Sequence, residues 1–236
     1  MAEKENKPVE VKGVSPRGVF KYPHLIEPDY GTDEHPIEEG EYNVWLVVDQ
    51  DVADKFLAKL QPAIDSALEI GEEGFAKLKP AQRKKLGELT VNEVGQPIYD
   101  PETEEPTGKY EFRFKTKASG VTPKGKAWTR KMTIFDASRT PIKKCEAIWG
   151  GSEGKLSYVA RPYFIAGQGM CGVSLYLEAV QLLELVAAGQ RTAEGYGFDD
   201  EEGYTAEEAG SEFDDSDDYD TAEADTGDDE GDSEDF

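Results

Sequence analysis

The chain has 236 residues and a net charge of −24, with 26 basic and 50 acidic residues. Residues 192–236 hold 21 of the acidic residues and no lysine or arginine, so residues 1–191 are close to neutral. No apolar run approaches the roughly 18–20 residues that span a bilayer, and the N-terminus, MAEKENKPVEVKG, has no hydrophobic stretch typical of a signal peptide. We therefore expect an intracellular protein that does not associate with membranes.

The first third of the chain predicts two strands and a helix. Residues 1–15 are charged and lack periodicity, which predicts a flexible N-terminal arm. Residues 18–30 are typical of a strand interrupted by prolines, and residues 41–48, EYNVWLVV, of a regular strand. Apolar residues then recur every four positions over 51–69, which predicts an amphipathic helix that Pro62 kinks or divides.

The middle and the end of the body return to a strand pattern. A short helix is expected after Pro80, since proline suits the first helical turn. A loop rich in proline and acidic residues then covers 95–108. Further strands are predicted at 109–117, 127–136, 155–164 and 172–185, with glycine-rich turns between them.

About five strands with one helix between them predict a mainly β fold. A five-stranded Greek-key barrel of the OB type, with an inserted α-helix and spanning residues 16–191, fits this count. A β-sandwich with the same strands is the alternative. Residues 192–236 lack apolar periodicity and cannot bury enough surface to fold, so we expect a disordered acidic C-terminal tail.

Positive charge is concentrated in one β-region. Residues 109–161 contain 13 basic and four acidic residues, interleaved with aromatic rings. Lysine and arginine that follow phosphates, together with rings that stack on unpaired bases, are typical of a single-stranded nucleic-acid surface. The alternative is an ordinary solvated sheet face, and Phe112, Phe114, Trp45 and Phe56 are assigned to the core. The candidate DNA-binding residues are Arg113, Lys115, Lys117, Trp128, Arg130, Lys131, Lys155, Tyr158, Arg161 and Tyr163.

The tail offers a second candidate function. A tethered polyanion resembles a DNA backbone and can occupy the basic region at high effective concentration until DNA displaces it. The displaced tail would then be available to partner proteins. The ring of its terminal phenylalanine would enter an apolar pocket of the partner, and its carboxylates would contact basic residues around that pocket. The candidate partner-binding residues are Asp232, Glu234, Asp235 and Phe236. A tail that only maintains solubility is the alternative.

Several segments together resemble the single-stranded-DNA-binding proteins of short-tailed, coliphage-type bacteriophages, a divergent OB-fold family. The tail that ends in phenylalanine matches that family, and so does the order of the segments along residues 18–190. One departure is Ser157, which stands where the family tends to place a lysine. The matching segments are IEPDYG (26–31), EYNVWLVV (41–48), PIYD (97–100), KYEFRFKTKAS (109–119), IWGGSEGKLSYVARPY (148–163) and GVSLYLEAVQLLELV (172–186).

This resemblance implies sequence-independent binding of single-stranded DNA in phage replication, recombination and repair, with strand protection and annealing, in the host-cell cytoplasm. It implies that Tyr163 is the functional aromatic residue and Lys155 a basic strand residue of the site. It further implies that the tail contacts the phage DNA polymerase and the helicase–primase, and that the protein forms a homodimer.

Other functions are less consistent with the sequence. An acidic chaperone or DNA mimic, acting through the tail on basic proteins, is the alternative, but it gains nothing from a basic β-region. The chain has no nucleotide-binding or hydrolase motif, and Asp136 and Glu146 lack the spacing of a nuclease site, so we expect no enzyme and no cofactor. Two cysteines and two histidines at unrelated spacings predict no metal site. An RNA target remains open, because stacking surfaces accept either nucleic acid.

Overall fold

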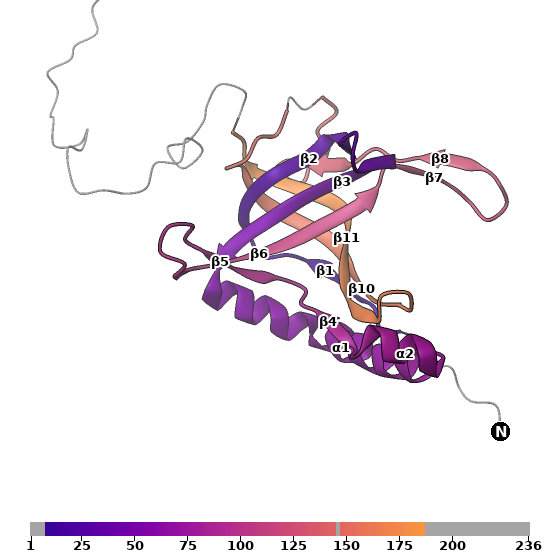
Figure 1. The fold of residues 1–236 in the computed structure, drawn as a ribbon. Helices are drawn as coiled ribbons and strands as arrows, with labels where there is room; N and C mark the ends of the chain where they lie inside the picture. Colours follow the sequence, from indigo (N-terminus) through magenta and orange to yellow (C-terminus); the bar gives the residue numbers. More distant parts are fainter. Residues whose placement is uncertain (1–7, 145–146, 187–236) are drawn as a thin grey trace, which may run out of the picture. The chain divides into compact units, whose positions relative to one another are not determined.

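Five long strands form a closed barrel in the computed structural model, which describes residues 8–144 and 147–186 (Figure 1). They follow the order β2–β3–β6–β11–β10 around the barrel, and β10 pairs with β2 to close it. Numbered along the chain, this order is 1-2-3-5-4, a Greek key, so the predicted OB-type barrel is confirmed. The five strands are β2 (Gly18–Gly31), β3 (Pro36–Asp49), β6 (Pro106–Lys117), β10 (Glu153–Ile165) and β11 (Met170–Glu184).

Alternation along the strands places one set of side chains inside the barrel. Phe112 and Phe114 of β6 have no exposed surface, and Phe56 of the helix packs against both rings. The centroids of Phe56 and Phe112 lie 5.0 Å apart with the rings nearly perpendicular, the edge-to-face arrangement that aromatic quadrupoles favour. The core assignment of these three rings is confirmed.

The inserted helix is longer than its pattern predicted. Helix α1 (Gln50–Ala76) runs unbroken through Pro62 and packs mainly against β10 and β11 (Figure 1). Pro62 lies on the exposed side of the helix, where the loss of one backbone hydrogen bond does not disturb the packed face. The predicted kink or division is therefore wrong. Helix α2 (Pro80–Leu86) begins at Pro80, as predicted.

Short strands complete the described part of the chain. They are β1 (Val11–Val14), β4 (Thr90–Asn92), β5 (Gln96–Tyr99), β7 (Ser119–Val121), β8 (Ala127–Thr129) and β9 (Thr133–Phe135). β7 and β8 form a separate hairpin, β4 and β9 each pair in parallel with β11, and β5 pairs with β6.

Other sequence-based boundaries also differ from the structure, and the loop predicted over 95–108 contains strand β5 and the start of β6. Part of the predicted arm, Val11–Val14, is strand β1 on the edge of β10, because Val11 packs against the core. Residues 127–136 form two strands that join different sheets. β2 is a single strand from Gly18 to Gly31 whose pairing with β3 shifts register instead of ending at the prolines. Within the described ranges, no helix is both long and apolar enough to cross a membrane.

Candidate nucleic-acid interface

The cations of β6 lie on the outer side of the barrel. Arg113, Lys115 and Lys117 alternate with the buried Phe112 and Phe114, so their side chains point away from the core. Arg113 lies opposite Trp45 of β3, and its guanidinium carbon is 5.7 Å from the centroid of that ring. We call this outward surface of β3, β6, β10 and β11 the basic face; it presents Trp45, Arg113, Lys115, Lys117, Arg161, Tyr163 and Tyr176.

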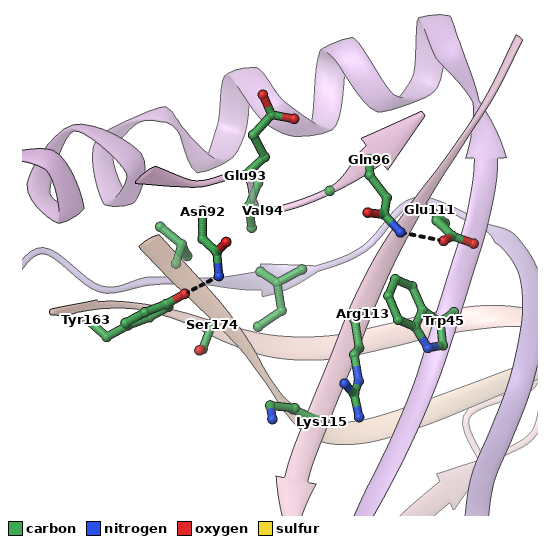
Figure 2. A pocket seen from close by; sticks show the side chains of 13 residues that line it. Trp45, Asn92, Glu93, Val94, Gln96, Glu111, Arg113, Lys115, Tyr163 and Ser174 are labelled. Atoms are coloured by element: carbon green, nitrogen blue, oxygen red, sulfur yellow. Dashed lines mark hydrogen bonds between the residues drawn. The ribbon is translucent and has the colours of Figure 1, made fainter. Parts of the chain in front are cut away.

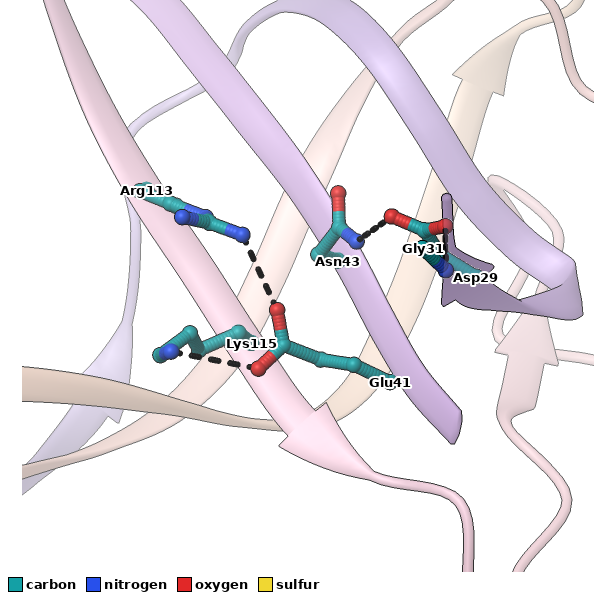
Figure 3. A network of polar contacts seen from close by, with 6 residues as sticks. All are labelled: Asp29, Gly31, Glu41, Asn43, Arg113 and Lys115. Carbon is teal, nitrogen blue, oxygen red and sulfur yellow. Dashed lines mark hydrogen bonds and ion pairs between the residues drawn. The ribbon is translucent and has the colours of Figure 1, made fainter. Parts of the chain in front are cut away.

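A carboxylate from β3 lies among these cations (Figure 3). Glu41 accepts from Arg113 Nη2 at 3.0 Å and from Lys115 Nζ at 3.1 Å, and its side chain is only 13% exposed. Lys117 pairs in the same way with Glu39, and the hydrogen bond between them raises the pKa of Lys117. Each of these three cations therefore has an acidic partner.

A second carboxylate is held beside Glu41 (Figure 3). Asp29 of β2 accepts from the backbone N–H of Gly31 at 2.8 Å and from Asn43 Nδ2 at 3.3 Å. The Gly31 hydrogen bond, followed by that of Asn43, holds the pKa of Asp29 below its usual range, because both favour the ionised form. These two hydrogen bonds lie where the pairing of β2 with β3 shifts register.

One hollow opens on the basic face where two barrel strands separate. β6 and β11 pair only at Phe114–Leu175 and Lys115–Tyr176, and the segment from β4 to β5 bridges the space beyond. This first hollow has a volume of about 290 Å³ (Figure 2). Its lining residues are Trp45, Asn92, Glu93, Val94, Gly95, Gln96, Glu111, Arg113, Lys115, Tyr163, Val173, Ser174 and Leu175.

The Tyr163 ring is fixed at one side of the first hollow. Its hydroxyl accepts from Asn92 Nδ2 at 3.0 Å. A Cβ at position 172 would lie 2.9 Å both from this hydroxyl and from the backbone oxygen of Asn92, so only glycine leaves room for the ring to cross β11. The ring is half-buried, with one side left to the hollow.

A second hollow of about 550 Å³ follows the first along β6 and β11. The Arg130 guanidinium carbon lies 5.7 Å from the ring centroid of Trp128, and that of Arg161 lies 4.5 Å from the ring centroid of Tyr176. Arg161 Nε also pairs with Glu10 at 3.0 Å. The residues lining this hollow are Thr116, Lys117, Trp128, Arg130, Lys131, Thr133, Val159, Arg161, Tyr176, Leu177 and Glu178.

The structure brings eight of the ten candidate DNA-binding residues to these two hollows. Lys155 lies farther along β10, opposite Gln181, and lines neither hollow. Tyr158 is a wrong assignment: its side chain is 2% exposed and packs in the core, with its centroid 5.5 Å from that of Phe56. Burial raises the pKa of its hydroxyl. Alternation with Leu156 and Ala160, both fully buried, already placed Tyr158 on the inner side of β10.

Some residues of the interface were not predicted. Trp45 was assigned to the core, but it lines the first hollow; it stands between the buried Val44 and Leu46, an alternation that points it outward. Tyr176 is 38% exposed, and alternation along β11 also pointed to it. Asn92 and Glu41 had no local signal, since their roles depend on strands distant in the sequence.

The predicted partner-binding residues of the tail, Asp232 to Phe236, lie outside the described ranges. Within those ranges, no group of three or more histidine, cysteine, aspartate and glutamate side chains is placed to hold a metal ion.

Known proteins resemble the chain over most of its length. The family model described as single-stranded DNA-binding protein, bacteriophage T7, matches residues 18–185. The crystal structure of gp2.5, a single-stranded DNA binding protein encoded by bacteriophage T7, is 22% identical with a TM-score of 0.56, covering 84% of this chain and 100% of that one. The single-stranded DNA-binding protein from bacteriophage Enc34 in complex with ssDNA is 14% identical with a TM-score of 0.46, covering 77% and 88%. No curated protein sequence matches the chain.

Proposed function

Because the chain belongs to the family of bacteriophage T7 single-stranded DNA-binding proteins, we propose that its basic face binds single-stranded DNA independently of sequence. The binding serves phage DNA replication, recombination and repair in the host-cell cytoplasm, by protecting strands and promoting their annealing. The protein acts as a binder and carries out no catalysis of its own.

The observation that carries this proposal is the succession of two hollows along β6 and β11, each combining cations with aromatic rings. A strand laid along the hollows places phosphates near Arg113, Lys115, Lys117, Arg130 and Lys131. Its bases reach the rings of Tyr163, Trp45, Trp128 and Tyr176, and stacking on a ring contributes about 1–3 kcal/mol per base whatever the base is. Both contacts are indifferent to sequence.

We extend the proposal to the acidic tail. Residues 192–236 carry 21 carboxylates and compete with DNA for the basic face. When DNA displaces the tail, Asp232, Glu234, Asp235 and Phe236 contact the phage DNA polymerase and helicase–primase. A homodimer belongs to the same proposal.

The experiment compares the full-length chain with a version that ends at Arg191, using fluorescence anisotropy of labelled oligo-dT across a salt series. We expect both to bind, the shortened chain more tightly, with affinity that falls steeply as salt rises. If neither binds, the proposed function fails. If the shortened chain binds DNA no more tightly than the full-length chain, the basic face binds DNA but the tail does not gate it. If only the full-length chain binds basic proteins, the alternative function as an acidic DNA mimic gains support.

A further inference from the structure

The first hollow has a size that suits a single base. Ligand pockets in proteins usually measure about 300–1,000 Å³, and this hollow is at the lower end with about 290 Å³. The side chains of Val94, Val173 and Leu175 line it beside the polar groups, so part of its surface is apolar, as the flat face of a base requires.

Rings and cations stand at its edges. Tyr163 is held at one side by Asn92 and by the missing Cβ of Gly172, and Trp45 stands at the other side beside Arg113 (Figure 2). Arg113 and Lys115 are within reach of a phosphate on the same nucleotide. A ring that is already fixed loses little conformational entropy when a base stacks on it.

Two carboxamides line the hollow, on Asn92 and Gln96, and each uses its nitrogen to bond a neighbouring side chain. Asn92 donates its amide nitrogen to Tyr163, and Gln96 donates its own to Glu111 Oε1 at 2.8 Å. These bonds turn both carboxamide oxygens toward the space between the two residues (Figure 2). Glu111 is 8% exposed and also accepts from Lys21 at 3.0 Å, so the orientation of Gln96 rests on a buried, fixed partner.

Two acceptors facing one space favour a base that offers an amino group. The exocyclic amino nitrogen of cytosine or adenine carries N–H donors, whereas thymine presents a carbonyl oxygen at the corresponding position. Thymine would set that oxygen against the oxygens of Asn92 and Gln96 and leave acceptors without a donor.

We propose that the first hollow is a base subsite that takes one nucleobase of the bound strand and prefers cytosine or adenine to thymine. The proposal rests on the proposed function and refines it. Phosphate contacts supply most of the affinity whatever the sequence, and the base in the first hollow adds a preference for cytosine or adenine.

The test measures binding of labelled oligo-dC and oligo-dT of equal length to the full-length protein. Homopolymers put the same base in the hollow in every register, and both pyrimidine strands stack weakly on themselves. We expect oligo-dC to bind at least about fivefold more tightly, the lower end of what one specific base contact provides. Gln96→Leu removes one acceptor and is expected to bring the dC:dT ratio close to one, with an unchanged circular-dichroism spectrum and melting temperature as the check of folding.

The matched control is Gln61→Leu, the same change on the exposed side of α1, where the side chain of Gln61 donates to Asp65. It should leave the dC:dT ratio unchanged. Equal binding of oligo-dC and oligo-dT by the unmodified protein would overturn the base subsite while the proposed function stands. A preference that survives Gln96→Leu would likewise overturn it, because the preference would then arise elsewhere. Failure to bind either oligonucleotide would instead overturn the proposed function.

Discussion

In the first hollow two cations share one largely buried carboxylate, whereas in the second the carboxylates that pair with cations are more exposed. Glu41 accepts from both Arg113 and Lys115, so the charge of both cations is already partly neutralised before a phosphate arrives. A phosphate that binds there must displace a largely buried carboxylate, which costs part of the interaction it gains.

In the second hollow Arg130 donates to a hydroxyl, that of Thr116. Arg161 and Lys117 each pair with a more exposed carboxylate, on Glu10 and Glu39, which a phosphate displaces at lower cost than a buried one.

The guanidinium of Arg130 lies over Trp128 and that of Arg161 over Tyr176. A stacked guanidinium interacts with the ring through its face and keeps N–H groups at its edge for an anion. The comparison indicates that the second hollow contributes more of the phosphate affinity and the first more of the base contacts.

The largest expected effect tests the phosphate side of this comparison. The double variant Arg130→Ala, Lys131→Ala removes two phosphate contacts from the second hollow. We expect the dissociation constant for oligo-dT to rise about 150-fold at low salt, a loss of roughly 3 kcal/mol of binding free energy. The slope of log affinity against log salt should become shallower by about 1.4, since each single-strand phosphate contact contributes about 0.7.

The control for this variant is Lys55→Ala, Lys59→Ala on the outer side of α1. It removes the same charge from a surface outside both hollows, and Lys55 pairs there only with Asp51 across one helical turn. If the two double variants weaken binding equally, net charge accounts for the affinity and the second hollow has no special role.

The next effect concerns the ring of the first hollow. Tyr163→Ala removes the stacking surface, and we expect oligo-dT binding to weaken by about 2 kcal/mol, or about 30-fold, with little change in the salt slope. Tyr163→Phe keeps the ring and loses only the bond to Asn92, so its effect should be small. Tyr99→Ala, at an exposed tyrosine of β5 outside both hollows, is the control. A weakening by Tyr99→Ala as large as that by Tyr163→Ala would contradict the role of the hollow.

The sequence predicted the barrel because its strands obey a period of two. In EFRF, buried phenylalanines alternate with exposed arginine, and the same rule placed Arg113, Lys115 and Lys117 on one face. The same alternation in β3 and β10 predicts that Trp45 points outward and Tyr158 inward. The two wrong assignments followed from residue type, whereas the position along the strand gives the correct side. Alternation therefore carries information on which rings are available to DNA.

Contacts between distant strands were beyond local reasoning. Glu41 meets Arg113 and Lys115 only because β3 and β6 pair in one particular register, with Glu41 opposite Lys117. The hydrogen bond from Asn92 to Tyr163 joins residues 71 positions apart. The charge count over residues 109–161 made this surface more basic than it is. The acidic residues that pair with three of its cations belong to β3, which lies outside the counted segment.

The smallest effect has the opposite sign and tests the carboxylate that distinguishes the first hollow. Glu41→Gln keeps the shape of the side chain and removes the charge that holds Arg113 and Lys115. We expect oligo-dT to bind about fivefold more tightly at low salt, about 1 kcal/mol, because the phosphate no longer competes with a neighbouring carboxylate. Glu69→Gln, on the exposed side of α1, makes the same change in net charge and should alter affinity far less. Weaker binding by Glu41→Gln would show that Glu41 positions the two cations for DNA, and the first hollow would then bind phosphate with its carboxylate in place.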